Sequence, residues 1–353
     1  MSKQLKSNLI TYGIIIAFFA IMQTLVGTGT ISSLFKGLLV PICVYTIMAV
    51  SLNLTVGILG ELSLGHAGFM CVGAFVSAFF SMCMKESGMN SIVRFIIAII
   101  LGAIVAAVFG ILIGIPVLRL RGDYLAIVTL AFGEIIKNIV NVLYVGKDSS
   151  GFHISFTDTA SLGLSSDGVV IIKGPQGITG TPNDSTFLIG IIILIITVFI
   201  VTNFVTSRSG RAVMAIRDNR IAAESVGINI SKYKLMAFAI SAGLAGAAGA
   251  LYAHNLNTLN ALPKNFGYNM SIMILVYVVL GGIGSIRGSI IAATILTALP
   301  ELLRGFSDYR MLIYSIVLIA LMLISNSPKA KMFFEKYSIK QLIGTKKAQK
   351  EEV

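Results

Sequence analysis

Charged residues are scarce in this sequence. Asp, Glu, Lys and Arg together make up 12% of the 353 residues, whereas about 25% is typical of soluble globular domains. Hydrophobic residues reach 56%, and the mean hydropathy is +0.90. So many apolar side chains cannot all fit into one soluble core and must face lipid or other buried helices. The composition excludes a water-soluble fold and indicates an integral membrane protein.

Cysteine and histidine are also rare. The three cysteines lie in apolar stretches, and their odd number argues against a disulfide framework, so we expect them to be packing residues. No Cys/His spacing typical of zinc is present. The sequence lacks a Gly-x-x-x-x-Gly-Lys-Ser/Thr phosphate loop, a Gly-x-Ser-x-Gly elbow and a His-Glu-x-x-His motif. We therefore expect no metal, no cofactor, no enzyme activity and no ATP binding by such a loop.

Long apolar runs between turn and charge signals predict an all-α, polytopic membrane protein with about ten transmembrane helices. The expected spans cover residues 9–30, 38–57, 62–84, 93–117, 123–145, 185–205, 235–256, 269–286, 288–304 and 309–326. The run Gly281-Gly282-Ile283-Gly284-Ser285 leaves the eighth and ninth spans short, so these two could instead form one re-entrant unit. We expect residues 1–327 to form one transmembrane domain and residues 328–353 to form a basic cytoplasmic tail.

Positive charge sets the expected orientation. If the amino terminus is cytoplasmic, the larger share of the 27 Lys and Arg residues falls in inside segments, so we expect both termini in the cytoplasm. The same rule explains the net charge of +12 without a nucleic-acid partner. The first 30 residues also resemble a cleavable signal peptide. Because the apolar segment from Leu9 to Val26 is long and no Ala-x-Ala site follows it, we favour an uncleaved first span in the cell membrane.

Two polar segments between the spans are long. Residues 146–184 form an expected extracytoplasmic loop, which is long enough for a small ordered element that contacts an external partner, although a mobile connection is the alternative. Residues 206–234 carry an excess of positive charge and are expected on the cytoplasmic side. Their pattern predicts short helices, the second of which ends at Gly227.

Small residues recur at helical spacing in two of the predicted spans. The fourth span has Gly102, Ala106, Gly110 and Gly114, and the seventh has Ala239, Gly243, Ala247, Gly246 and Ala250. Such stripes let a second helix backbone approach closely. We expect them to serve packing rather than chemistry.

Polar residues inside the spans are the candidates for a translocation path, because a charge at the centre of a span costs about 2.5 to 3.5 kcal/mol on insertion scales. Glu134 shares one face of the fifth span with Lys137, Asn138 and Asn141. Glu134 and Lys137 could neutralise each other, line a polar path or relay protons. A second polar set, made of Asn53, Ser63 and His66, could line a path or form hydrogen bonds at helix ends. The path candidates are Asn53, Ser63, His66, Glu134 and Asn138.

Several blocks of this sequence are informative together: Ser51–Gly57, Leu62-Ser63-Leu64-Gly65-His66-Ala67-Gly68-Phe69, Arg121–Ile135, Gly210–Gly227, Lys234–Gly249, Val279–Ser285 and Pro300–Arg304. In this order they resemble the LivM-type permease subunits of branched-chain amino acid ABC importers. The resemblance covers residues 38 to 326. Two places depart from the family: Ser325-Asn326-Ser327-Pro328 replaces its Arg-Pro segment, and Lys173 replaces a glycine of its outer-loop turn. The second departure weakens any inference about how a binding protein is recognised.

The resemblance implies a helical permease that works with a second related permease subunit, two cytoplasmic ATPase subunits and an extracytoplasmic substrate-binding protein. Residues 208–227 would then be the coupling loop, with Arg211, Arg217, Asp218 and Glu224 as contacts to the ATPase. The implied function is ATP-driven import of branched-chain amino acids by alternating access. A urea or short-chain amide permease, an ion-coupled secondary transporter that uses Glu134 and Lys137, and a passive channel remain alternatives.

Overall fold

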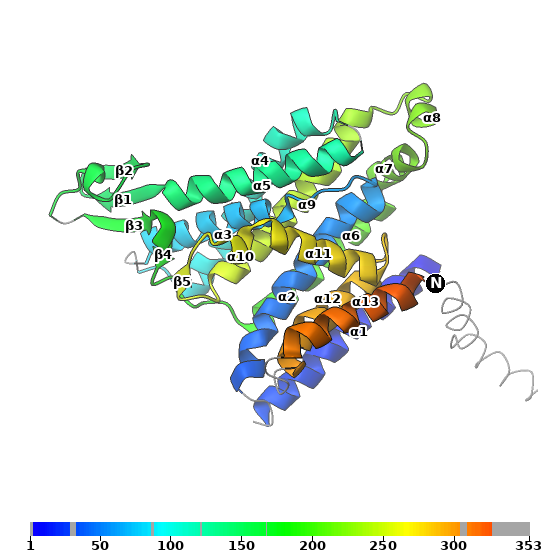
Figure 1. Cartoon of the computed structure of the whole chain (residues 1–353), viewed down its shortest axis with the longest axis horizontal. Helices are drawn as coiled ribbons and strands as arrows, with labels where there is room; N and C mark the ends of the chain where they lie inside the picture. Colours follow the sequence, from blue (N-terminus) through cyan, green and yellow to red (C-terminus); the bar gives the residue numbers. More distant parts are fainter. Residues whose placement is uncertain are drawn as a thin grey trace, which may run out of the picture. The chain divides into compact units, whose positions relative to one another are not determined.

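Apolar helices make up most of the fold. The computed structural model describes residues 3–28, 33–85, 88–120, 122–166, 168–303 and 309–326. Its helices (Figure 1) are α1 (Lys3–Gly27), α2 (Ser33–Asn53), α3 (His66–Cys83), α4 (Ser91–Val117), α5 (Asp123–Val142), α6 (Phe187–Thr206), α7 (Arg208–Asp218), α8 (Arg220–Ser225), α9 (Ile230–Ala253), α10 (Pro263–Phe266), α11 (Tyr268–Gly281), α12 (Ile286–Leu302) and α13 (Arg310–Asn326). A π-helix, η1 (Leu54–Leu59), continues α2.

The chain divides into two compact units, Met1–Thr297 and Ala298–Val353. Helices α1 to α11 and most of α12 belong to the first unit, and α13 belongs to the second. The predicted cytoplasmic tail, residues 328–353, lies outside the described residues. The sites discussed below all lie within the first unit.

Six helices of the described part are long and apolar enough to cross a membrane. They are Phe35–Leu59, His66–Cys83, Ser91–Val117, Asp123–Val142, Phe187–Thr206 and Ile230–Ala253. The expectation of a polytopic helical membrane protein is confirmed. The apolar stretch Thr11–Gly27 and helices α11, α12 and α13 are shorter, and the 14 residues of α11 cover about 21 Å of a hydrocarbon core of about 30 Å. The count of ten spans and the side of the termini stay predictions.

Helices α3, α4 and α9 pack against one another through small residues. A Cβ added at Gly73 of α3 would lie 2.2 Å from the Gly246 carbonyl oxygen of α9, and one at Gly249 would lie 2.1 Å from the Met70 carbonyl oxygen. At Gly102 of α4 it would lie 2.8 Å from the Gly73 carbonyl oxygen. The predicted close approach along the glycine and alanine stripes is confirmed, because these backbones touch where only glycine leaves room.

The all-α expectation needs one correction, in the segment between α5 and α6. Antiparallel strands β1 (Tyr144–Asp148), β2 (Gly151–Ser155) and β3 (Val169–Lys173) form a sheet in the order β2-β1-β3, and Tyr144 lies opposite both Ser155 and Lys173. Two further short strands, β4 (Ile178–Thr179) and β5 (Thr258–Leu259), pair with each other. The segment is therefore an ordered element, and it lies at the opposite end of the first unit from α7 and α8 (Figure 1). Period-2 patterning over such short strands was too weak to predict them beside strong helical signals.

Candidate functional site

A polar site lies more than half-way along α5, where α11 begins. Glu134 is the twelfth of the 20 residues of α5, and its side chain is 26% exposed. One carboxylate oxygen accepts a hydrogen bond of 2.8 Å from the backbone N–H of Tyr268, the first residue of α11. The other oxygen pairs with the ammonium of Lys137, which agrees with the predicted alternative that Glu134 and Lys137 neutralise each other. Both Lys137 and the positive end of the α11 dipole therefore stabilise the carboxylate.

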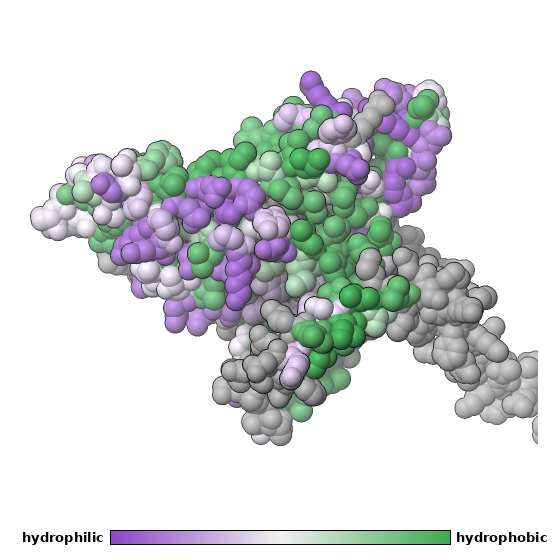
Figure 2. Space-filling model, in the orientation of Figure 1, coloured by the Kyte–Doolittle hydropathy of each residue, from purple (hydrophilic) through white to green (hydrophobic). Residues whose placement is uncertain are grey.

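The face of α5 around this site carries polar side chains among exposed apolar ones, such as Ile135 and Ile139. Asn138 is exposed, and Asn141 donates a hydrogen bond of 3.0 Å to the Ala261 carbonyl oxygen, next to α10. By contrast, every exposed residue of α4 from Ile92 to Ile115 is apolar. Figure 2 shows a hydrophilic region where Figure 1 draws α5 and α10. A polar side chain in hydrocarbon is costly, so the exposed position of Asn138 suits contact with protein or water.

The other three path candidates lie inside the bundle and do not share this exposed face. Asn53, Ser63 and His66 are at most 2% exposed. His66 Nε2 forms a hydrogen bond of 2.7 Å with the Ser51 hydroxyl. Among the described residues, the buried Ser63 hydroxyl has no hydrogen-bond partner. Their place in a translocation path stays a prediction, and in this conformation the surrounding helices enclose them.

Asn53 connects α2 to the turn between α11 and α12. Its Oδ1 accepts a hydrogen bond of 2.8 Å from the Gly284 backbone N–H, and its Nδ2 donates one of 2.9 Å to the Ser289 hydroxyl. The turn itself is glycine-rich, and Gly282 and Gly284 both have φ in the left-handed region, at 92° and 83°. The predicted interruption of the eighth and ninth spans is confirmed as a true break between two helices.

The basic loop after α6 folds into the predicted short helices because each begins with a capping residue. At the start of α7, the Ser207 hydroxyl accepts a hydrogen bond of 3.1 Å from the Gly210 N–H. At the start of α8, the Asn219 side-chain oxygen accepts one of 3.0 Å from the Ala222 N–H. Helix α8 is followed by Gly227, whose φ of 83° provides the expected helix end. A small core of Ile216, Ala223 and Ile230 holds the loop against the start of α9.

The four predicted coupling residues have different environments in this loop. Arg211 donates to the Thr206 carbonyl oxygen (2.8 Å) at the end of α6. Arg217 pairs with Asp218 at 2.9 Å and also donates to the Gly57 carbonyl oxygen (2.9 Å) of η1. Asp218 and Glu224 are exposed.

Two exposed apolar residues of the same loop were missed by the sequence analysis. Ile221 is 81% exposed and Val226 is 74% exposed, in and directly after α8. Figure 2 shows a hydrophobic spot among hydrophilic residues at this end of the first unit. Apolar residues in an otherwise charged loop were the available signal for this exposed spot.

Comparison with known proteins agrees with this architecture. The family model described as "Branched-chain amino acid transport system / permease component" matches residues 34–325. The chain belongs to this permease family. The permease is 34% identical over 293 residues to LivM of Salmonella typhimurium, a "High-affinity branched-chain amino acid transport system permease protein". The aligned region covers 79% of the permease but 66% of LivM, so it spans slightly less than two thirds of that relative.

Two more distant relatives define the range of the likeness. LivH of Salmonella typhimurium, with the same description as LivM, is 22% identical over 79% of the permease and 89% of LivH. The "Fructose import permease protein FruG" of Bifidobacterium longum is 25% identical over 87% of the permease and 85% of FruG. No solved structure matches the chain. The likeness establishes a multi-pass membrane permease. Because the relatives carry different solutes, the solute has to be inferred from the chemistry of the translocation path.

One buried ion pair of the permease was not predicted. The ammonium of Lys234, in α9, pairs with the carboxylate of Glu61, which follows η1, and their side chains are 7% and 14% exposed. The pair holds the start of α9 to the segment between η1 and α3. The sequence places Glu61 near the end of a span and Lys234 in the basic loop, but nothing in it brings together two residues 173 positions apart.

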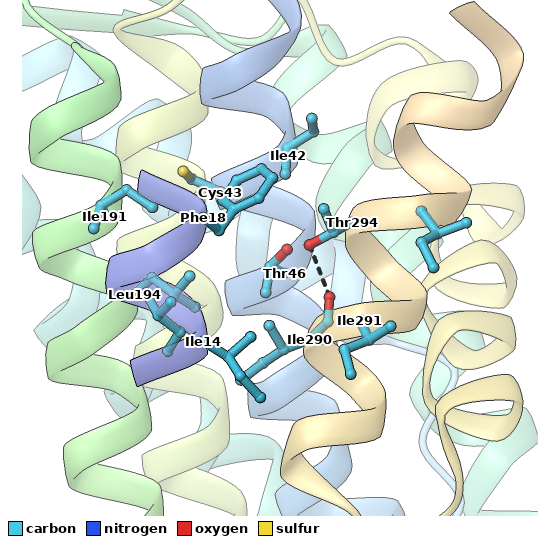
Figure 3. Close-up of a pocket in the computed structure, with 12 residues that line it drawn as sticks. Ile14, Phe18, Ile42, Cys43, Thr46, Ile191, Leu194, Ile290, Ile291 and Thr294 are labelled. Atoms are coloured by element: carbon cyan, nitrogen blue, oxygen red, sulfur yellow. Dashed lines mark hydrogen bonds between the residues drawn. The ribbon is translucent and has the colours of Figure 1, made fainter. Parts of the chain in front are cut away.

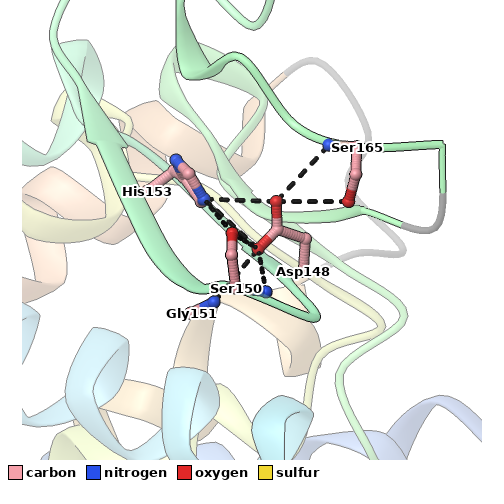
Figure 4. A network of polar contacts seen from close by, with 5 residues as sticks. All are labelled: Asp148, Ser150, Gly151, His153 and Ser165. Carbon is pink, nitrogen blue, oxygen red and sulfur yellow. Dashed lines mark hydrogen bonds and ion pairs between the residues drawn. The ribbon is translucent and has the colours of Figure 1, made fainter.

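A network around Asp148 stabilises the sheet at the other end of the unit (Figure 4). Asp148 accepts hydrogen bonds from the hydroxyl and N–H of Ser150 and from the N–H of Gly151, and it contacts His153 and Ser165. The hydroxyl of Ser150, followed by the N–H groups of Ser165 and Ser150, holds the pKa of Asp148 below its ordinary value. All these partners belong to the sheet segment. The network therefore stabilises the turn that joins β1 to β2.

An apolar pocket between α1, α2, α6 and α12 does not suit a zwitterion. It has a volume of about 130 Å³ and is lined by residues that include Phe18, Cys43, Thr46 and Leu194 (Figure 3). Its polar lining atoms are few, and the Thr294 hydroxyl is already bonded to the Ile290 carbonyl oxygen (2.8 Å). Burying an amino-acid ammonium or carboxylate there would leave the charge unpaired. The side of α5 that carries Glu134 and Asn138 is the better candidate for the translocation path.

Proposed function

We propose that this permease is the membrane-spanning subunit of an ATP-driven importer that moves branched-chain amino acids by alternating access. The observation that carries the proposal is the family match over residues 34–325, joined to a capped, charged α7–α8 loop suited to receive a push from a motor protein. The likeness to LivM supports branched-chain amino acids over urea or short-chain amides. Ten spans and cytoplasmic termini complete the proposed topology.

The translocation path runs along the polar face of α5 and the start of α11. A branched-chain amino acid has an apolar side chain and a zwitterionic backbone, so its path must offer polar partners without trapping it. Glu134, Lys137 and Asn138 provide such groups in the second half of α5, beside the first turn of α11, and helix ends at the substrate site are known from transporters. The face is exposed on this chain, so a second related permease subunit closes it. That two permease proteins of one organism share the branched-chain amino acid description supports such a pair.

One of the two motor subunits binds at α7 and α8 of this chain. Two ATPase subunits serve the assembly, one of them on this chain, with Arg211, Arg217, Asp218 and Glu224 as polar contacts. Ile221 and Val226 add exposed apolar side chains, which form the usual centre of a protein interface. The sheet segment within residues 146–184, at the opposite end, contacts an extracytoplasmic substrate-binding protein.

Transport by the reconstituted assembly tests this proposal. We expect proteoliposomes with both permeases, the ATPase and the binding protein to accumulate radiolabelled leucine, isoleucine or valine only when ATP is supplied. Urea and fructose serve as competing solutes and should not reduce leucine uptake. Accumulation driven by an ion gradient without the ATPase would instead support the secondary transporter, and flux with neither energy source would support the channel.

Substitution of Asn138 by leucine tests the path. Loss of one hydrogen bond to the passing solute is worth about 0.5 to 1.5 kcal/mol, so we expect the KM for leucine uptake to rise by about twofold to tenfold. Ile139→Leu, at the neighbouring exposed position, is the matched control and should transport normally. Equal kinetics for both variants would remove Asn138 from the path.

A further inference from the structure

The second span ends in an unusual backbone conformation. After Asn53 the chain continues as the π-helix η1, Leu54–Leu59, and closes at Gly60 with a φ of 79°. π-helical turns are rare and are found frequently at functional sites. Because a π-helix has more residues per turn than an α-helix, conversion between the two forms would rotate Gly57 relative to Asn53.

One side of η1 contacts the coupling loop. The guanidinium of Arg217, in α7, donates a hydrogen bond of 2.9 Å to the Gly57 carbonyl oxygen. Its aliphatic stem lies over Gly60, where an added Cβ would be 2.6 Å from Arg217 Cγ. Movement of α7 would thus act directly on the backbone of η1.

The other side of η1 contacts the turn between α11 and α12. A Cβ added at Gly57 would lie 2.0 Å from Asn53 Oδ1 and 2.3 Å from the Gly284 nitrogen, so these groups are in direct contact. Asn53, which is 1% exposed, binds the turn through both atoms of its amide, to Gly284 and Ser289. From this turn α11 runs back to Tyr268, whose N–H is bonded to Glu134.

We propose that Asn53 is a positioning residue of the transport cycle, one that transmits the movement of α7 through η1 to α11 and so to the Glu134 site. Arg217 pulls on the Gly57 carbonyl, and Asn53 moves the turn at Gly284 together with η1. Helix α11 carries the displacement to its own first turn. This inference rests on the proposed function, because it assumes a motor that moves α7. It assigns Asn53 to coupling rather than to the lining of the path.

The test separates coupling from folding by measuring uptake per ATP hydrolysed in the complete reconstituted transporter. Asn53→Leu removes both hydrogen bonds of the amide, Ser289→Ala removes one, and Arg217→Met removes the contact with Gly57. We expect Asn53→Leu and Ser289→Ala, which lie away from the proposed ATPase contacts, to hydrolyse ATP at close to the normal rate. Leucine uptake per ATP should fall by about fivefold or more for Asn53→Leu and Arg217→Met, as is typical of a lost coupling free energy, and less for Ser289→Ala.

Two substitutions elsewhere in the coupling loop are the matched controls. Arg208→Met removes an exposed arginine from the other end of α7, and Ser225→Ala removes an exposed hydroxyl that bonds only within α8. Both should retain the normal uptake per ATP. If Asn53→Leu fails to assemble, Ser289→Ala, which removes one of the two Asn53 hydrogen bonds, decides the question. Normal uptake per ATP in the assembled variants overturns the inference, whereas an unsubstituted transporter without ATP-dependent uptake overturns the proposed function itself.

Discussion

Substitution of Gly73 by leucine is expected to abolish the folded permease. A Cβ at this position would lie 2.2 Å from the Gly246 carbonyl oxygen, and that oxygen belongs to the backbone of α9 and cannot rotate away. Helices α3 and α9 would have to separate, which also disturbs the contact of α4 with Gly73. Overpacking of a core costs 1–3 kcal/mol or more, and we expect a loss of more than about 3 kcal/mol here. The amount of monodisperse protein in detergent and its thermal unfolding midpoint measure the effect.

The same substitution at Gly37 of α2 is the control. A Cβ at Gly37 meets nothing within 4 Å, so the leucine side chain can point into open space. We expect Gly37→Leu to express and unfold like the unsubstituted protein. A stable Gly73→Leu protein would mean that the α3 and α9 backbones do not approach as closely as described.

Substitution of Lys234 by methionine is expected to have the second largest effect. It leaves the Glu61 carboxylate enclosed without its partner, since the side chain of Glu61 is only 14% exposed. Removal of one member of a buried ion pair destabilises proteins by about 3–5 kcal/mol. We therefore expect a lower unfolding midpoint and loss of the contact between α9 and the segment after η1. Lys232→Met, two residues earlier and exposed, should leave the midpoint unchanged.

A second substitution, at Glu61, distinguishes the effect of the unpaired charge from the effect of lost side-chain packing. Replacement of both partners by apolar residues of similar volume is often neutral in buried pairs, because no unpaired charge remains. The double variant Glu61→Leu with Lys234→Met should therefore unfold at a higher temperature than Lys234→Met alone. If it is no more stable than the single variant, the lysine acts through its methylene stem rather than its charge.

Capping and hydropathy made the secondary structure predictable at several particular places. Ser207 and Asn219 begin the helices of the coupling loop because each supplies a side-chain acceptor to a free N–H group. The glycines between 281 and 284 break the eighth and ninth spans because they allow a backbone conformation that other residues avoid. The sheet of residues 144–173 was missed, since its strands have only five residues each.

The amino-acid sequence by itself determined the class of this protein, a polytopic helical membrane protein, because long apolar runs have few stable conformations other than helices in lipid. It also determined which polar residues share a helix face, such as Glu134 and Asn138. Only the tertiary structure decided which faces meet. Asn53 and Gly284 are 231 positions apart, and helical periodicity carries no information on how helices are arranged around one another. For the same reason, only the packing shows Asn53 enclosed beside a turn and Glu134 on an exposed face.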